Sequence, residues 1–529
     1  MKKEELFEAL GDIDEESIKK AGEYTRPKKN ITRWIAPLAL CAAAVFLVVF
    51  CLPLITKNGK DPGGTEPTVA DKPGSGNAGP TGTENVKPTE AKPTEAAPTE
   101  TPGEGSGAAS YAGREYSANI LRDMAECPAP VAADMSAEDF LLGDAHWEWW
   151  SEHCRGIDSS IGLSASMKSY YRSVMEKVLV SDDNTVCSPI NTFFAVAMLA
   201  EVSDGNTRQQ VLDLLGAADI ETLRGNVSTL FHNNYVDTPA LKSLPANSIW
   251  LNSDLAYNDE TLDTLAKQYF VSSFRGKGGS EELNEALRIW TDDNTGGLLS
   301  EYTKDMATDP ALVMELVSAF YYKAMWSEVF QEGATDKAVF HGTNGDTDVD
   351  MMHRSEMTAV YRNDRFSALG MGLTDSGSMY FFLPEEGVDV NTLLTDDEVY
   401  SVLASNGYGG SGWTNPLVHM SIPKFKVSCK TDILETLKEL GVTDATDPSK
   451  ADFSKLTDAD GVYLGKADHA AMLEIDEEGV TGAAYTDMAL CGASMPEDEI
   501  DFIVDRPFFF AVTASDGSIL FAGIMRNID

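Results

Sequence analysis

One ten-residue segment of the chain, AHWEWWSEHC at residues 145–154, combines residue types that could hold a metal ion. His146, His153 and Cys154 are of the types that bind zinc, but no fourth ligand stands at a spacing typical of a zinc site. The three tryptophans of the same segment favour aromatic packing instead. We therefore expect no metal site and no cofactor.

The sequence lacks the signatures of the common catalytic sites. It contains no GxSxG elbow, no HExxH helix, no GxxxxGK[ST] loop and no GxGxxG after an expected strand. Six of its seven histidines have no carboxylate or nucleophile at a suggestive spacing. The formal net charge of −43 argues against nucleic acid as a partner, because phosphate binding needs clustered Lys and Arg. We expect neither an enzyme nor a nucleic-acid-binding protein.

The N-terminal part of the chain differs in composition from the rest. Residues 34–55 carry no charge and, at about 1.5 Å per residue, would span roughly 33 Å as a helix, enough to cross a bilayer core. Arg26 and Arg33 precede this run, so the positive-inside rule places residues 1–33 in the cytoplasm. Residues 56–112 are rich in Pro, Thr, Gly, Glu and Lys, which is typical of a disordered spacer. We expect a retained single-pass anchor rather than a cleaved signal peptide, because a long leader of mixed charge precedes the apolar run.

Residues 113–529 have the composition of a globular domain. Helical patterns dominate its first half and strand patterns its second half, which favours an α+β fold over alternating βαβ units. Residues 113–162 form an ambiguous extension, in which the segment 116–126 has a helical pattern. Cys127 and Cys154 could pair in an oxidising compartment, and the sequence leaves this pairing open.

Five blocks of sequence, in order and at matching spacing, resemble the serpins, a family of serine protease inhibitors. They are VCSPINTFFAVAMLAEVSDGNTRQQVLDLLG at 186–216, LVSAFYYKAMWSEVF at 316–330, the segment 422–457 that begins IPKFKVSCK, KADHAAMLEIDEEG at 466–479, and FIVDRPFFFAV at 502–512. The resemblance runs from about residue 163 to the C-terminus. It implies a serpin fold, with about nine helices packed on three β-sheets and an exposed reactive loop.

The same resemblance identifies the reactive loop and places the bond that a protease attacks at Ala493–Ser494. The hinge, where the loop would begin to insert into a sheet, comprises Glu477, Glu478, Gly479, Val480, Thr481, Gly482, Ala483 and Ala484. Because side chains of a strand alternate between faces, an inward-facing Val480 would place only uncharged residues inward as far as Leu490. Three hinge residues depart from the family's usual types, but all three are uncharged, so insertion stays plausible.

A sheet-opening region beneath the loop is also implied by the resemblance. Its residues are Ser188, Asn191, Ser318, His469 and Trp326. The family usually carries serine where Asn191 stands and asparagine where Ser318 stands, so we interpret the pair as a reciprocal exchange. Since buried polar groups need partners, we expect the exchange to preserve a hydrogen-bond network with Ser188 and His469.

These observations predict a membrane-tethered, extracellular serpin of bacterial type that acts as a monomer. It is expected to be a suicide inhibitor, which inserts its cut loop into a β-sheet and traps the target serine protease as a covalent acyl complex. The small Ala493 suits elastase-like or subtilisin-like proteases with shallow apolar pockets. Two alternatives stay open: a non-inhibitory serpin that acts as a binding module, and a cell-surface sensor or enzyme that uses residues 113–162.

Overall fold

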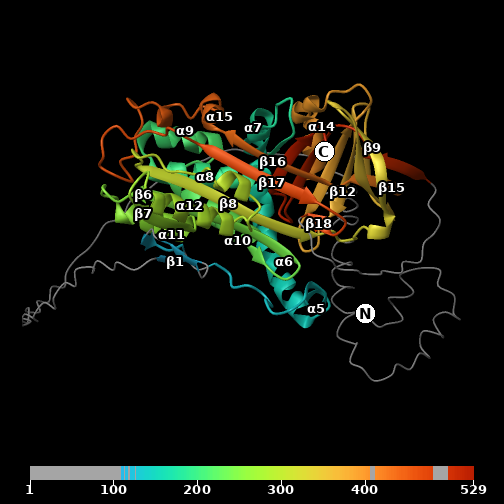
Figure 1. Ribbon diagram of the computed structural model, residues 1–529, viewed down its shortest axis with the longest axis horizontal. Coiled ribbons are helices and arrows are strands. Elements are labelled where there is room, and N and C mark those ends of the chain that lie inside the picture. The colour runs from blue at the N-terminus through green and yellow to red at the C-terminus, as the bar shows by residue number, and fades with distance from the viewer. Residues whose placement is uncertain are drawn as a thin grey trace, which may run out of the picture. The chain divides into compact units, whose positions relative to one another are not determined.

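The computed structural model describes residues 109–111, 114–116, 119–124, 127–405, 412–480 and 498–528 (Figure 1). The expected cytoplasmic tail and membrane span, and most of the expected spacer, lie outside these residues. Within the described part of the chain, no helix is both long enough and apolar enough to traverse a bilayer. The first described strand, β1 (Ala109–Tyr111), pairs with β2 (Arg114–Tyr116). Strand β1 thus lies just before residue 113, where the globular domain was expected to begin.

The largest sheet contains the strands on which the hinge is expected to act. Its order is β16 (Phe425–Asp432), β17 (Asp468–Ile475), β18 (Gly479–Val480), β8 (Met314–Met325), β6 (Leu241–Asn252), β7 (Val271–Gly276) and β3 (Asn119–Arg122), with β5 (Val236–Asp237) pairing to β6. Only β6 and β7 run parallel to each other among these neighbours. In Figure 1 the orange strands β16 and β17 lie along one side of the yellow-green β8.

Two further large sheets complete the β structure of the domain. One has the order β14 (Trp413–Thr414), β11 (Val360–Arg362), β12 (Phe366–Gly372), β13 (Ser378–Pro384), β20 (Phe508–Thr513), β21 (Ile519–Met525) and β4 (Thr185–Cys187). The other has the order β19 (Glu499–Ile503), β15 (Leu417–Pro423), β10 (Gly345–Met357) and β9 (Thr335–Gly342). Every residue of β20 and β21 is buried, which explains their unbroken apolar sequence.

The helices pack on both faces of the largest sheet. They are α5 (Ala137–Leu141), α6 (Asp144–Ser166), α7 (Lys168–Val178), α8 (Pro189–Val202), α9 (Gly205–Leu215), α10 (Ile220–Asn234), α11 (Asp259–Gln268), α12 (Glu281–Asp293), α13 (Ser300–Thr303), α14 (Asp397–Ala404) and α15 (Leu434–Glu439). Short 3-10 helices are η2 (Glu332–Ala334), η3 (Val390–Thr395) and η4 (Asp444–Thr446). Helix α8 is buried along nearly its whole length and packs against both β8 and β21. The prediction of an α+β fold with three main sheets is confirmed.

The prediction of a helix over residues 116–126 is wrong. Residues 119–122 form β3, which adds a strand to the edge of the largest sheet beside β7. Arg122 anchors this strand by ion pairs to Asp259 at 2.8 Å and Asp263 at 2.7 Å, both on α11. The helical pattern was overridden because an exposed sheet edge offers a complete row of backbone hydrogen-bond partners.

The tryptophan-rich segment is part of the long helix α6 and packs as an aromatic cluster. Trp149 stacks on His153 with ring centroids 4.9 Å apart. His146 instead contacts Asp375, with 2.7 Å between the imidazole Nε2 and a carboxylate oxygen. Nearby, Phe140 of α5 is fully buried in a small cluster that includes Met325 at the end of β8. Cys127 and Cys154 are both thiols, so no disulfide joins them.

Candidate functional site

The hinge begins with a tight turn between β17 and β18. The Asp476 carboxylate accepts hydrogen bonds from the backbone N–H groups of Glu478 at 2.9 Å and Gly479 at 3.1 Å. The Asp476 N–H donates to the carbonyl of Gly479 at 3.1 Å, which closes the turn. These bonds direct the chain back along β17, where Val480 pairs with Ile475. A short side chain that accepts backbone N–H bonds two and three residues ahead is a common turn device.

The second neighbour of β18 is β8, so Val480 of the hinge is already paired on both sides. Gly479 lies opposite Met325 and Val480 opposite Ala324. A Cβ atom added to Gly479 would approach the carbonyl oxygen of Ala324 to 2.1 Å, so only glycine fits this position. The Val480 side chain is 1% exposed and belongs to the main core. Val480 therefore faces inward, as the expected alternation of the loop requires.

Trp326 holds the turn against the end of β8. Its indole N–H donates to the carbonyl of Asp476 at 2.9 Å, and its backbone N–H donates to the carbonyl of Glu478 at 3.0 Å. The indole itself is 1% exposed. A buried tryptophan with a satisfied N–H combines a large apolar contact with a directional bond. Trp326 thus fixes the position at which the hinge leaves the sheet.

Glu477 anchors the hinge to the neighbouring strands through its carboxylate. The oxygens accept hydrogen bonds from Lys424 at 2.7 Å and from the Thr335 hydroxyl at 2.8 Å. Burial alone would raise the pKa of Glu477, but these two hydrogen bonds outweigh it and hold the pKa below its ordinary value. The hydrogen bond to Glu477 likewise raises the pKa of Lys424. The pair is ionised near neutral pH and ties β9 and the start of β16 to the hinge.

Beyond β18, strands β8 and β17 flank a slot and form no ladder with each other along their described lengths. A cavity of about 80 Å³ lies in this slot. Its lining includes Ser188 and Asn191 at the start of α8, Ser318 of β8, and Ala470, Ala471 and Met472 of β17. Where two neighbouring strands form no hydrogen bonds with each other, their backbone N–H and C=O groups are available to pair with an added strand.

A polar network spans the floor of the slot. The Asn191 side-chain amide donates to the Ser318 carbonyl at 3.0 Å, and the Ser318 hydroxyl donates to the side-chain oxygen of Asn191. The backbone N–H of Ser188 donates to His469 Nε2 at 3.0 Å, and the Ser188 hydroxyl accepts from the Asn191 N–H at 3.4 Å. Ser188 is also the N-cap of α8. The structure thus brings together all four polar residues that the resemblance assigned to the sheet-opening region.

His469 takes part in this network as a neutral ring. It is 6% exposed, and burial lowers its pKa to about 4. A neutral imidazole has one unprotonated nitrogen, which here accepts the Ser188 N–H. The network therefore contains no buried charge at neutral pH.

Asn247 of β6 is a member of the network that the sequence did not reveal. Its side-chain oxygen lies 2.8 Å from the Ser318 hydroxyl, and its amide donates to the carbonyl of Tyr269 at 2.9 Å. The available signal was the polar pair Asn247–Ser248 inside a mainly apolar strand pattern at residues 246–251, since buried polar residues in such a run need partners. The remaining predicted site residues, Thr481, Gly482, Ala483, Ala484, Ala493 and Ser494, lie outside the described residues.

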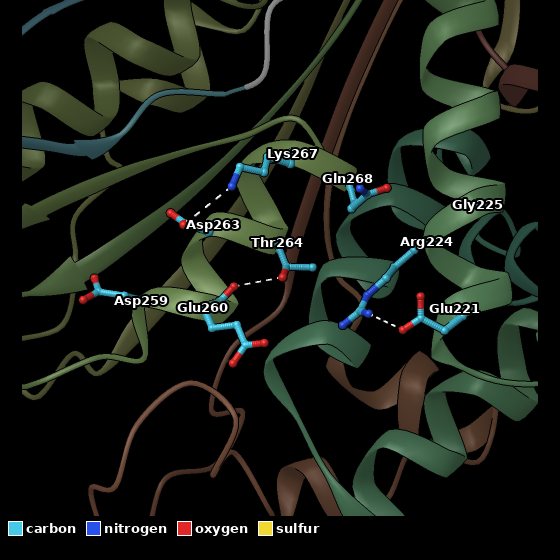
Figure 2. A pocket seen from close by; sticks show the side chains of 9 residues that line it. All are labelled: Glu221, Arg224, Gly225, Asp259, Glu260, Asp263, Thr264, Lys267 and Gln268. Carbon is cyan, nitrogen blue, oxygen red and sulfur yellow. Dashed lines mark hydrogen bonds and ion pairs between the residues drawn. The ribbon is translucent and has the colours of Figure 1, made fainter. Parts of the chain in front are cut away.

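A larger hollow of about 690 Å³ lies between α10 and α11, away from the hinge strands (Figure 2). Most of its charged side chains pair with each other, with Arg122 of β3 or with Glu201 of α8. Figure 2 shows Arg224 directed at Glu221, and Lys267 lies 3.6 Å from Asp263. A site whose charges are already neutralised by neighbours presents little specific attraction to a ligand. We therefore take the slot, not this hollow, as the candidate functional site.

Comparisons with known proteins agree with the geometry. Residues 165–528 match the family described as "Serpin (serine protease inhibitor)". Serpin B11 of Mus musculus is 27% identical over 367 residues, covering 64% of this chain and 92% of the relative. Serpin-ZX of Arabidopsis thaliana is 27% identical over 390 residues, covering 69% of this chain and 98% of the relative.

Solved structures are similar at the level of the fold. The thermophilic serpin tengpin in its native state has a TM-score of 0.62 and 24% identity, covering 69% of this chain and 94% of that one. Human thyroxine-binding globulin, solved in complex with thyroxine, has a TM-score of 0.61 and 22% identity, covering 69% of this chain and 98% of that one.

Proposed function

Because the chain belongs to the serpin family, we propose that it is a suicide inhibitor of serine proteases rather than an enzyme. The observation that carries this proposal is that the described start of the hinge, β18, pairs with both β17 and β8, the two strands that flank the slot. A strand that has started between two neighbours can be extended by further residues of the same segment. Serpin loop insertion is a known example of such strand addition.

The proposed reaction uses the protease's own chemistry. The protease serine attacks the carbonyl carbon of Ala493, the peptide bond to Ser494 breaks, and the new amine leaves with the C-terminal part. The acyl ester then links the protease to Ala493. Once released from Ser494, residues from Thr481 onward enter the slot between β8 and β17 and carry the ester-linked protease along the sheet. Distortion of the protease during this movement prevents water from completing hydrolysis.

The residue before the attacked bond indicates the class of target. Ala493 offers a single methyl group, which gains on the order of 1 kcal/mol in an apolar pocket. Proteases with wide or charged primary pockets gain no further binding free energy from this methyl group. Elastase-like and subtilisin-like proteases, whose pockets are shallow and apolar, are therefore the expected targets.

We also propose that the inhibitor is held at the outer surface of a bacterial-type cell membrane. The support is the sequence alone: the uncharged run 34–55, the basic residues before it and the spacer composition of residues 56–112. In this arrangement the inhibitor acts as a monomer outside the cell, and its partners are the membrane and a protease. Resistance of residues 1–33, and sensitivity of residues 113–529, to a protease added to intact cells would test this topology.

The test of inhibition uses the full chain in mild detergent, incubated with an elastase-like protease. We expect a complex that survives a denaturing gel and a released peptide whose N-terminal sequence begins at Ser494. The cut molecule should also melt at a higher temperature than the intact one, because its main sheet has gained a strand. Cleavage without any covalent complex would favour the non-inhibitory binding module, and a ligand- or metal-dependent change confined to residues 113–162 would favour a sensor or enzyme.

A further inference from the structure

One edge of the largest sheet is closed by a strand from outside the part of the chain that matches the family. Residues 165–528 match the family, and β7 is the outermost described strand that they contribute at this edge. Strand β3 comes from the preceding extension and pairs antiparallel with β7, with Asn119 opposite Arg275 and Ile120 opposite Phe274. The chain's own extension thus covers the edge that β7 would otherwise present.

Strand β7 has the properties of an edge that needs protection, whereas β3 does not. The first four residues of β7, VSSF at 271–274, are uncharged and buried, so its free backbone groups would be open to any approaching strand. Strand β3 has only four residues, its register shifts between Ile120 and Arg122, and Arg122 adds a charge. Short length, a bulge and a charge are devices by which proteins keep an edge strand from pairing. The extension therefore replaces an exposed, uncharged edge with a protected one.

Side chains of β3 fix it to the elements around β7. Ile120 and Leu121 pack against two different buried clusters of apolar residues. The Arg122 guanidinium donates from Nε to Asp263 at 2.7 Å and from Nη2 to Asp259 at 2.8 Å. Both aspartates belong to α11, which itself packs against β7. Strands β3 and β7 and helix α11 are therefore tied together as one unit.

The sequence of β7 suits antiparallel pairing with a second copy of the same strand. Such a pair has two-fold symmetry, and about the midpoint of β7 it sets Ser272 opposite Arg275 and Ser273 opposite Phe274. Like charges, which destabilise a pair when they lie directly opposite, then do not face each other. The membrane tether proposed above would also raise the local concentration of copies. An uncovered β7 would therefore pair readily with the β7 of a neighbouring copy.

We propose that β3 is an intramolecular cap, and that the edge of β7 beneath it is a self-association site that takes the β7 edge of a second copy when β3 is displaced. This inference rests on the monomeric state proposed above, for which it supplies a structural cause, and it does not depend on inhibition. The extension, which lies outside the family match, then serves to keep tethered copies of the chain separate.

Two substitutions release β3 without changing β7. Arg122→Glu places a carboxylate against Asp259 and Asp263, and Ile120→Pro introduces a residue that cannot continue a strand ladder. Because the ion pairs of Arg122 are partly exposed, their loss should leave the core intact. The matched control is Arg155→Glu, which makes the same charge change at an exposed position on α6.

The full-length wild type, the control and the double variant with Ile120→Pro and Arg122→Glu are compared in mild detergent. Light scattering over a concentration series measures dimerisation, and hydrogen exchange measures the protection of each strand. We expect the double variant to dimerise about tenfold more strongly than the control. Its β7 amides should exchange fast in the dilute monomer and slowly in the dimer, while β20 stays protected throughout and shows that the fold is intact. An excess of a peptide with the sequence of residues 116–124 should dissociate the dimer.

A double variant that exposes β7 and still stays monomeric would overturn the proposal. A dimer in which β7 continues to exchange fast would do the same, because the contact would then lie elsewhere. Unchanged protection of β7 in the dilute double variant would show that β3 is not what covers this edge, and would also overturn it. Inhibition is measured separately, by the covalent complex of the wild type with a protease. Absence of that complex would reject inhibition and leave the cap in place, whereas a covalent complex beside a monomeric double variant would reject the cap and retain inhibition.

Discussion

Replacement of Val480 by arginine should convert the protein from an inhibitor into a substrate of its target protease. Val480 is 1% exposed and is the first inward-facing residue of the strand that has to grow. Its removal from the core costs about 1.5–3 kcal/mol. A buried, unpaired guanidinium in its place would cost several kcal/mol more. The inserted state is destabilised by this full amount, because its strand cannot form without burying residue 480.

In the intact protein the segment Gly479–Val480 can detach from β8, so that the guanidinium reaches water and only the burial of Val480 is lost. We therefore expect Val480→Arg to lower the free energy of unfolding by about 1.5–3 kcal/mol, the value of the lost burial, and to lose the driving force for insertion as well. A loss of several kcal/mol is at least a hundredfold shift between the inserted and free loop. Cleavage at Ala493 should continue, but hydrolysis of the acyl ester should now be faster than insertion of the loop.

The assay is the number of inhibitor molecules consumed per protease molecule inactivated, together with a denaturing gel. We expect a ratio near one for the wild type and for the control Val480→Thr, and a large excess of cut inhibitor without complex for Val480→Arg. If Val480→Arg traps the protease as efficiently as Val480→Thr, residue 480 is not buried in the final complex and the insertion reasoning fails.

Three further substitutions test the surroundings of the slot. Asn191→Ser should lower the free energy of unfolding by about 1–3 kcal/mol, because it removes both hydrogen bonds between Asn191 and Ser318. The double variant with Ser318→Asn should recover part of this loss, and unchanged melting and inhibition would refute the exchange. Because folding lowers the pKa of His469 from 6.5 to about 4, the free energy of unfolding should decrease by roughly 3 kcal/mol as the pH falls from 6.5 to 4. Urea unfolding should show that His469→Gln lacks this dependence of stability on pH. An equal pH dependence in both proteins would contradict the prediction. Phe140→Ala should cost about 3 kcal/mol, measured by the same unfolding, because the ring is fully buried; a loss below 1 kcal/mol would mean that α5 is dispensable.

The sequence was informative where local pattern and packing agree. The strands around Phe509 and Leu520 could be predicted because both of their faces are buried and the apolar run is unbroken. Alternation related the faces of the loop residues to one another, but that Val480 faces inward came from its burial in the structure. Asn191 and Ser318 could be paired only through the resemblance, since nothing in their local sequence relates two positions that are 127 residues apart.

Other features depend on contacts that no local pattern encodes. The strand at residues 119–122 exists because β7 offers it an edge, and its own residues would equally suit a helix. The pairing of His146 with Asp375 joins positions 229 residues apart, and Asp375 itself adopts a left-handed backbone conformation with φ of +58°. The pairing of β3 with β7 and the contact between His146 and Asp375 therefore arise from the fold, which brings distant segments together, and not from the local sequence.

The composition of the slot explains how a strand can enter it without unfolding the domain. Its floor is held by hydrogen bonds among Ser188, Asn191, Ser318 and His469, and each such bond contributes only about 1 kcal/mol net. Breaking and remaking a few bonds of this kind is far less costly than removing large side chains from a packed core. Because His469 is neutral, this hydrogen-bond network exposes no charge as β8 and β17 move apart. A strand that presents small uncharged residues to this floor can therefore replace weak contacts with a continuous ladder on both sides, and the hinge pairs at Gly479 and Val480 already set its register.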